Sequence, residues 1–279
     1  MAKNIIRALR LPFITASILP FIFGSLICVR NFNFLGFLLG ISSVISTHLS
    51  ANLINDYFDS KSGVDWQDKN FYGFFGGSKL IQENLLSEQF YLKGALFCAC
   101  LAFSSVICLA LVLKSAFVVL IYLLIITLSW QYTAKPLAFS YNYFGEFIIL
   151  LLFGPALVMG GYFIQTGIFP DLKSFIMSLP LGLFTAAILY ANEIPDFPQD
   201  SKSGKNNLVK LFGHKNAYIF YYVLMFLGFL MIILSVFLGY LGSISLVSLF
   251  LILLVIRAGG ILKESPLDKL KLIDRKSVV

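Results

Sequence analysis

The sequence predicts an all-α fold, a polytopic bundle of transmembrane helices. Hydrophobic residues make up 58% of the 279 residues and charged residues only 13%, whereas a soluble domain is roughly half apolar and a quarter charged. Several apolar runs reach the roughly 20 residues that a helix needs to cross the hydrocarbon core of a bilayer. These runs do not alternate between apolar and polar residues, which argues against the short strands of a β-barrel.

The apolar runs predict eight spans within one transmembrane domain, residues 1–279. The spans are expected near Leu11–Val29, Phe34–Asn55, Phe90–Leu113, Ala116–Tyr132, Phe144–Gln165, Ser174–Glu193, Tyr218–Leu238 and Leu241–Ile256. The first run is too long for the core of a signal peptide, and no A-x-A pattern follows it, so we expect an uncleaved first span.

The first acidic motif stands where the second apolar run ends. Asn52, Asp56 and Asp59 follow the spacing i, i+4 and i+7, which places their side chains on one face of a helix. Asp65 follows in the adjoining loop. Two carboxylates and a carboxamide that face one way at a membrane edge are costly unless a positive charge lies between them. The motif therefore predicts a site for a cation.

The second acidic motif repeats this pattern about half the chain later. Asn192, Asp196 and Asp200 follow the spacing i, i+4 and i+8, and the five letters DSKSG occur in both motifs. We interpret the protein as two related halves, about 1–140 and 141–279. The halves have the same orientation, and each brings one acidic motif to a shared central cavity.

Oxygen ligands at the membrane edge suit Mg²⁺, which bridges carboxylates to the phosphates of a substrate. Lys61, Lys202 and Lys205 lie beside the motifs and add positive charge for phosphate oxygens. One such motif alone is typical of a solvated helix end, but its repetition favours a functional site. Neither motif follows the D-x-D-x-D-G pattern of a Ca²⁺ loop.

Further candidate residues lie near the span ends. The glycines of the loop at 76–79 allow close approach to an anion, and Lys79 adds charge; a plain turn is the alternative. Lys135 is the only basic residue of the loop after the fourth span, which fits either a membrane-interface belt or a site. Glu146 is a functional candidate as an intramembrane acid. His48 is expected to be packed or hydrogen-bonded rather than a ligand.

The distribution of Lys and Arg predicts the orientation. Of the 21 Lys and Arg residues, only Arg30, Lys114 and Lys173 fall in loops on the side opposite to the acidic motifs. By the positive-inside rule, both motifs and both termini are cytoplasmic, in the inner membrane of a bacterial-type cell. The net charge of +7 therefore reports loop orientation, and no nucleic-acid partner is expected.

With these motifs the chain resembles the UbiA superfamily of intramembrane aromatic prenyltransferases, over about residues 10–215. Within the superfamily it is most similar to the branch that acts on 1,4-dihydroxy-2-naphthoate in menaquinone synthesis. The residues that carry the resemblance are Asn52, Asn55, Asp56, Asp59, Gly63, Asp65, Asn192, Asp196, Asp200, Gly204 and Lys205.

The resemblance implies a Mg²⁺ cofactor, an isoprenyl diphosphate, an aromatic acceptor and a site within the lipid bilayer. The C–O bond of the diphosphate ionises to an allylic cation, which an electron-rich ring attacks; for a dihydroxynaphthoate, the carboxylate is replaced. Ten residues are implied: Asp56, Asp59, Asp65, Asp196 and Asp200 as metal ligands, with Asn52 and Asn192 assisting, and Lys79, Lys135 and Lys205 as contacts of the diphosphate or substrate.

The chain also departs from the family pattern. Ser60 stands where the usual second Asp of the first motif lies, so Asp59 or Asp65 completes the motif. Pro195 and Pro198 flank Asp196 and predict a kinked or unwound end for the second motif. The family usually has nine spans, against the eight expected here.

Three alternative functions compete with this interpretation. The first is prenyl transfer to another acceptor, such as 4-hydroxybenzoate or homogentisate. The second is a CDP-alcohol phosphotransferase, which is disfavoured because its D-G-x₂-A-R pattern is absent. The third is an ion-coupled membrane transporter, in which acidic residues are expected near the bilayer midplane rather than at span ends.

Overall fold

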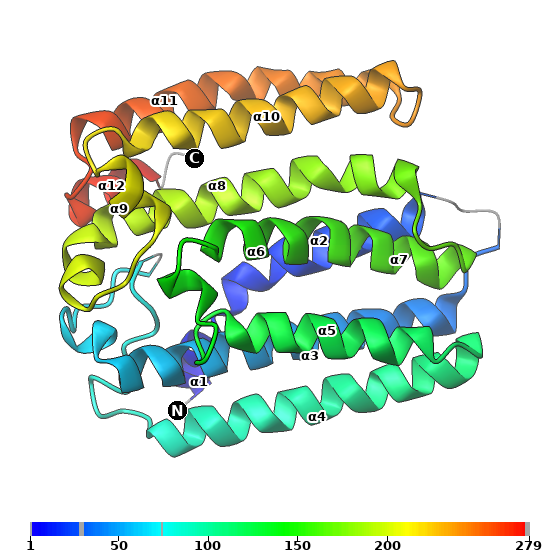
Figure 1. Cartoon of the computed structure of the whole chain (residues 1–279), viewed down its shortest axis with the longest axis horizontal. Helices are drawn as coiled ribbons and strands as arrows, with labels where there is room; N and C mark the ends of the chain where they lie inside the picture. Colours follow the sequence, from blue (N-terminus) through cyan, green and yellow to red (C-terminus); the bar gives the residue numbers. More distant parts are fainter. Residues whose placement is uncertain (1, 28–30, 74, 277–279) are drawn as a thin grey trace.

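The computed structural model describes residues 2–27, 31–73 and 75–276; Arg30 of the orientation argument lies outside them. Throughout the described residues the regular elements are helical (Figure 1). They are α1 (Ala2–Ala8), η1 (Leu11–Ile14), α2 (Thr15–Leu26), α3 (Phe34–Ser62), η2 (Val64–Trp66), α4 (Glu88–Leu113), α5 (Phe117–Gln131), η3 (Phe139–Tyr141), α6 (Gly145–Leu151), η4 (Leu152–Ala156), α7 (Leu157–Thr166), α8 (Leu172–Lys202), α9 (Leu208–Phe212), α10 (Ala217–Phe237), η5 (Ser243–Leu251), α11 (Ile252–Glu264) and α12 (Lys269–Lys276).

Among the described residues, six helical segments are long and apolar enough to cross a membrane: Phe34–Ser62, Glu88–Leu113, Gly145–Thr166, Leu172–Lys202, Ala217–Phe237 and Ser243–Glu264. The other two expected spans correspond to shorter apolar helices, Leu11–Leu26 and Phe117–Gln131. At about 1.5 Å per residue, the 15 residues of α5 extend only about 22 Å, which is less than the roughly 30 Å of a bilayer core. The predicted all-α transmembrane bundle is confirmed, with two of its eight expected spans short.

Short polar residues set the ends of the long helices. The side chain of Asn33 accepts a hydrogen bond from the amide of Gly36 and caps α3, and Asp171 caps α8 in the same way. These caps satisfy amides that have no partner within the helix. The first motif helix ends at Gly63, whose φ of 85° is a left-handed conformation that glycine adopts without strain.

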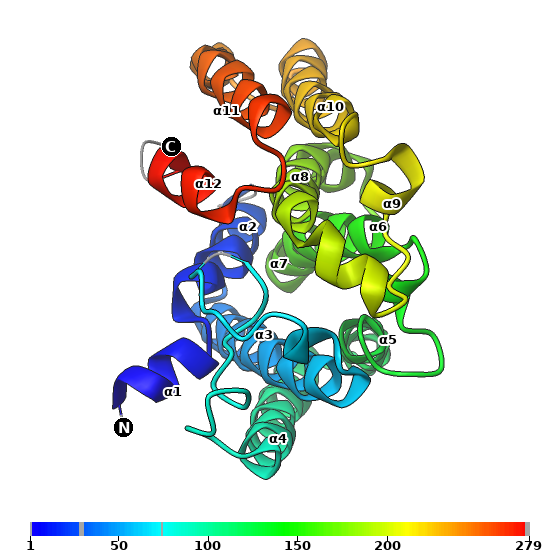
Figure 2. The ribbon, with the colours of Figure 1, turned by 90° about the vertical axis from the view of Figure 1, so that its left-hand side faces the viewer.

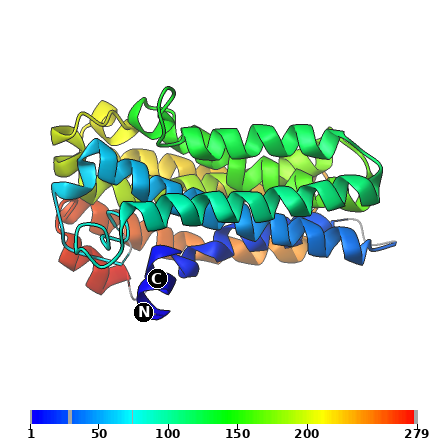
Figure 3. The same cartoon turned by 90° about the horizontal axis from the view of Figure 1, so that it is seen from below.

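The long helices run side by side, and the ends that carry the acidic motifs lie at the same end of the bundle (Figures 1 and 2). The loops that follow α3 and α8 gather at this end together with α9 and α12 (Figure 3). Helix α4 packs against α3, and α10 packs against α8. Each motif helix thus has one neighbouring long helix from its own half, although the relationship of the two halves as a repeat stays a prediction.

Helix α8 is continuous through both of its motif prolines, so the predicted unwound end is wrong, whereas the predicted kink stays a prediction. The helix runs from Leu172 to Lys202 with Pro180, Pro195 and Pro198 inside it. Proline fixes φ near −65°, which is compatible with a helix, and it removes only one hydrogen bond. Ala191 and Ile194, beside these prolines, are buried in the core that α8 forms with α10, and this packing holds the helix together.

A second irregularity lets the fifth apolar segment approach α8 closely. Between α6 and α7 the chain forms the π-helical turn η4, which contains Gly154 and Pro155. A Cβ atom on Gly154 would lie only 2.9 Å from the Cα atom of Gly182 on α8. Small residues at such a crossing allow the backbones of membrane helices to touch.

The outward faces of the helices are apolar and open. Leu111, Phe237, Ile244 and Phe250 are 73–85% exposed. Large apolar surfaces of this kind are covered by lipid in membrane proteins. Together with the apolar spans, they make this a multi-span membrane protein.

Candidate active site

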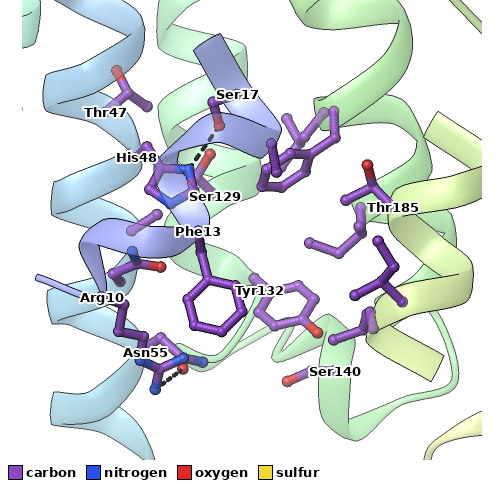
Figure 4. Close-up of a pocket in the computed structure, with 18 of the residues that line it drawn as sticks. Arg10, Phe13, Ser17, Thr47, His48, Asn55, Ser129, Tyr132, Ser140 and Thr185 are labelled. Carbon is purple, nitrogen blue, oxygen red and sulfur yellow. Dashed lines mark hydrogen bonds between the residues drawn. The ribbon is translucent and has the colours of Figure 1, made fainter. Parts of the chain in front are cut away.

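A cavity of about 1370 Å³ lies inside the bundle and extends to the end that carries the acidic motifs. Both acidic motifs line one part of it, and apolar side chains from α2, α3, α4, α5, η4 and α7 line the rest. Figure 4 shows a close-up of its lining, in which Arg10, Asn55, Phe13, Tyr132 and His48 are labelled. The Nδ1 atom of His48 is hydrogen-bonded to Ser17 Oγ at 2.7 Å, which confirms the prediction for this residue.

In the first motif, Asp56 is buried beneath a residue of the N-terminal segment. The side chain of Asp56 is only 3% exposed and forms an ion pair with Arg10, which also donates to Asn55 Oδ1 at 3.3 Å. Asn52 donates from Nδ2 to the carbonyl of Leu9 at 3.1 Å. The motif therefore holds residues 9 and 10 against α3.

The other two carboxylates of this motif face the cavity. The hydroxyl of Tyr141 donates to Asp59 Oδ1 at 2.7 Å. The turn at Gly63 brings Asp65 back toward α3, where Lys79 Nζ donates to its Oδ1 atom at 2.8 Å. Burial, reinforced by the negative charge of Asp59, raises the pKa of Asp65 to about 7. Both Asp59 and Asp65 line the cavity, so either position can complete the motif.

The second motif presents its carboxylates along one face of α8. Asp200 accepts a hydrogen bond from Asn207 Nδ2 at 3.0 Å and pairs with Lys205 at 3.3 Å. Asp196 pairs with Lys269 of α12 at 2.7 Å. Burial lowers the pKa of Lys205, but the carboxylates around it, Asp200 first, outweigh burial and raise this pKa well above its usual value. Lys205 is therefore held as a cation.

The loop at 76–79 lies between the two motifs. A Cβ atom on Gly77 would lie 3.1 Å from Asp56 Oδ1 and 3.2 Å from Asp65 Oδ2, and one on Gly76 would lie 3.8 Å from Asp196 Oδ1. Both glycines have positive φ angles, of 66° and 79°. The backbone of this loop can follow the carboxylates closely only because these residues lack side chains.

Gly77→Ala is expected to be more disruptive than Gly73→Ala. Both glycines have a φ of 79°, so alanine at either position brings the same left-handed strain of about 1–2 kcal/mol. A Cβ on Gly73 meets nothing within 4 Å, whereas one on Gly77 crowds Asp56, Arg10 and Asp65, which adds about 1–3 kcal/mol. Thermal unfolding in detergent measures the difference, and equal losses of Tm would contradict the proposed close contact.

Most of the predicted residues converge at this end of the cavity, and one does not. Asn52, Asp59, Asp65, Lys79, Asn192, Asp196, Asp200 and Lys205 line it, with Asp56 buried beneath Arg10. Lys135 is exposed in the turn that follows α5 and does not line the cavity. The structure therefore does not bring Lys135 to the other predicted residues, although the same turn reaches the first motif through Thr133, whose hydroxyl accepts a hydrogen bond from Asn55 Nδ2.

The structure also adds residues that the sequence argument did not select. Arg10, Asp68, Tyr141 and Lys269 contact motif carboxylates or the lysines paired with them. Glu193, 4% exposed on α8, interacts with the equally buried Glu146 of α6. A signal in the sequence existed only for Arg10, a basic residue just ahead of the first apolar run, and for Glu193, which adjoins Asn192.

The candidate metal ligands of the two motifs are carboxylate and carboxamide oxygens. No group of three or more His, Cys, Asp or Glu side chains gathers as a metal cluster in the part of the chain that the structure describes. Mg²⁺ does not require one, because it typically takes one or two carboxylates and completes its shell with phosphate oxygens and water. Asp56 and Asp65 both reach the space over Gly77. The oxygen-only donors on both motifs therefore fit Mg²⁺ bound together with a diphosphate.

Comparisons with known proteins agree with this geometry. The profile of the UbiA prenyltransferase family matches residues 17–269. UbiA prenyltransferase domain-containing protein 1 of Homo sapiens is 32% identical over 240 residues, which are 81% of this chain and 66% of that protein. The 1,4-dihydroxy-2-naphthoate octaprenyltransferase of Bacillus subtilis (strain 168) is 28% identical over 207 residues, 73% of this chain and 64% of that protein. The matches thus span about two thirds of these relatives.

The fold has close counterparts among solved structures. A UbiA homolog from Archaeoglobus fulgidus bound to GPP and Mg²⁺ has a TM-score of 0.71 at 16% identity, with 99% of this chain and 95% of that chain covered. The apo structure of a UbiA homolog from Aeropyrum pernix K1 also has a TM-score of 0.71, at 17% identity, with 93% of each chain covered. On the family profile, the relatives and the shared fold, this chain belongs to the UbiA prenyltransferase family.

Proposed function

We propose that this protein transfers a polyprenyl group from an isoprenyl diphosphate to a hydroxylated aromatic acid in a Mg²⁺-dependent reaction. The observation that carries the proposal is the convergence of both acidic motifs on one end of a largely apolar cavity. The polar end suits a metal-bound diphosphate, and the apolar remainder suits a long hydrocarbon tail. Membership of the family and the GPP and Mg²⁺ in the Archaeoglobus fulgidus structure support the same assignment.

In this proposal the carboxylates on α3, η2 and α8 hold Mg²⁺ together with the diphosphate, assisted by Asn52 and Asn192. Bound Mg²⁺ supplies screening of the negative charge that develops on the departing diphosphate. Arg10, Lys79 and Lys205 approach the same end of the cavity. They stabilise the diphosphate as the C–O bond breaks and the electron pair leaves with oxygen.

Aromatic side chains in the lining of the cavity stabilise the other product of that step, the allylic cation. Phe13 and Tyr132 present their rings to the cavity next to the motifs (Figure 4). Ring faces attract a desolvated cation, and the apolar lining excludes the water that would quench it. A ring carbon of the acceptor then forms the new C–C bond with the cation, and the ring regains aromaticity by losing the group on that carbon, a proton or, for 1,4-dihydroxy-2-naphthoate, the carboxylate as CO₂.

We propose 1,4-dihydroxy-2-naphthoate as the acceptor, which places the protein in menaquinone biosynthesis. The support is the 28% identity to the Bacillus subtilis 1,4-dihydroxy-2-naphthoate octaprenyltransferase. We further propose that the protein lies in the cytoplasmic membrane with the motif end on the cytoplasmic side. The support is the excess of Lys and Arg in the loops on the motif side.

The test is transfer by purified protein in detergent with Mg²⁺ and a long-chain prenyl diphosphate. The acceptor panel contains 1,4-dihydroxy-2-naphthoate, 4-hydroxybenzoate and homogentisate. We expect a prenylated product with 1,4-dihydroxy-2-naphthoate, and we expect no product when EDTA is added. Product with another acceptor alone would overturn the acceptor assignment. Folded protein that forms no product with any acceptor would overturn the enzymatic proposal and favour an ion-coupled transporter.

A further inference from the structure

Lys269 of α12 contacts α8 and the loop after η2 at the end of the cavity that the acidic motifs line. Its Nζ atom lies 2.7 Å from Asp196 Oδ1 on α8 and 3.0 Å from Asp68 Oδ2 in the loop after η2. The ammonium also lies 4.8 Å from the centre of the Tyr72 ring. Lys269 is 8% exposed and lines the cavity. Lys269 is thus a buried cation shared by two carboxylates, and not one half of a surface ion pair.

The helix that carries Lys269 is anchored by a second residue on the same face. Leu272, one turn further along α12, is 1% exposed and belongs to the core cluster of α8, α10 and α11. Lys271, by contrast, is exposed and pairs only loosely with Asp268, at 3.7 Å. Lys269 and Leu272 are three residues apart and share the inward face of α12, where both line the cavity, whereas Lys271 lies on the opposite face toward solvent.

Lys269 completes a pattern of charge pairing at the two motifs. Four motif carboxylates each contact one cation: Asp56 contacts Arg10, Asp65 contacts Lys79, Asp196 contacts Lys269, and Asp200 contacts Lys205 of its own motif. A divalent cation that binds Asp196 competes with Lys269 for the same carboxylate oxygens. The displaced ammonium then lies beside the metal-bound diphosphate, for which a lysine is a good point-charge ligand.

We propose that Lys269 is a further diphosphate-binding residue of this site and that Asp68 positions it. The ligand class rests on the proposed function, whereas the residue assignment rests on the contacts of α12. On this basis Lys269 has opposite effects on the binding affinities for a divalent cation and for a diphosphate. It opposes a divalent cation that binds alone, and it favours the diphosphate that follows.

These two opposite effects on affinity provide a test, because a lysine with a purely structural role would not produce them. Isothermal titration of the full chain in detergent measures Mg²⁺ alone, and then inorganic diphosphate in the presence of Mg²⁺. Lys269→Met is expected to weaken diphosphate binding by about tenfold or more, the effect of one charge-assisted hydrogen bond. The same variant is expected to bind Mg²⁺ alone as tightly as the native protein or more tightly.

Matched variants separate charge from structure. Lys269→Arg is expected to retain diphosphate binding to within about threefold, and Lys271→Met is expected to leave both affinities unchanged. Asp68→Asn is expected to weaken diphosphate binding less than Lys269→Met does. If Lys269→Met does not fold, Asp68→Asn provides the test, and unchanged diphosphate affinity in a folded Asp68→Asn protein then overturns the proposal.

The outcomes separate this inference from the proposed function. If the native protein and Lys269→Met bind inorganic diphosphate with equal affinity, the assignment of Lys269 is overturned and the prenyltransferase proposal still stands. Native protein that binds neither inorganic diphosphate nor a prenyl diphosphate in the presence of Mg²⁺ overturns the proposed function itself.

Discussion

Arg10→Met is expected to destabilise the protein by about 3–5 kcal/mol, because it leaves a buried carboxylate without its partner. The carboxylate is Asp56, whose side chain is 3% exposed and forms an ion pair with Arg10. Loss of the guanidinium also removes the hydrogen bond to Asn55, so prenyl transfer is expected to fall together with stability. Thermal unfolding and the transfer assay, both in detergent, measure the two effects.

Arg7→Met is the matched control, since Arg7 lies one turn earlier in the same segment. Its ion pair with Glu83 is partly open, with side chains 20% and 31% exposed, and such pairs contribute at most about 1 kcal/mol. Similar losses of stability in Arg10→Met and Arg7→Met would contradict the prediction, because they would show that burial of the ion pair does not set the size of the effect. Arg10→Met/Asp56→Asn should recover part of the lost stability, because the buried charge is then absent as well.

Asp196→Asn is expected to lower prenyl transfer by at least about 100-fold while the protein stays folded. Asparagine has the same shape but lacks the charge that attracts a metal ion, and even partners of metal ligands typically account for 10- to 100-fold in affinity or activity. Asp196 is 17% exposed at the side chain and lines the cavity, and its partner Lys269 keeps Asp68 as a counter-ion at 3.0 Å, so the substitution leaves no unpaired buried cation. Initial rates as a function of Mg²⁺ concentration measure the loss.

Asp268→Asn is the control for this second prediction, because Asp268 lies next to Lys269 yet faces solvent, with a side chain 42% exposed. Its rate is expected to equal that of the native protein. An Asp196→Asn protein that retains the native rate and the native Mg²⁺ dependence would remove this carboxylate from the proposed metal site.

The all-α membrane fold and the shared face of each motif could be predicted from the sequence, because both depend on local regularities. An apolar run of sufficient length is stable as a helix in lipid irrespective of its neighbours. Residues spaced by four lie on one face of any helix. Asn192, Asp196 and Asp200 lie on one face of α8 in the structure as well. The shortness of α2 and α5 was not visible in hydropathy, which measures polarity and not helix ends.

Tertiary structure decided the counter-ions of the motif carboxylates. Arg10, Tyr141 and Lys269 come from segments distant in sequence from the aspartates that they contact. No spacing rule connects such residues, because only the packing of separate helices brings them together. Lys135 shows the converse, since it lies near a span end in the sequence but is exposed outside the cavity.

The second motif shows local and tertiary effects in opposition. Pro195 and Pro198 lower the local propensity for a helix, yet α8 continues to Lys202 because its buried face packs against α10. The sequence by itself thus determined the helical spans, the acidic faces and the family. Only packing between helices decided three features: the continuous helical end of α8, the cations that pair with the motif carboxylates, and the contact of α12 with Asp196. The energy of that packing is not recorded in any local sequence pattern.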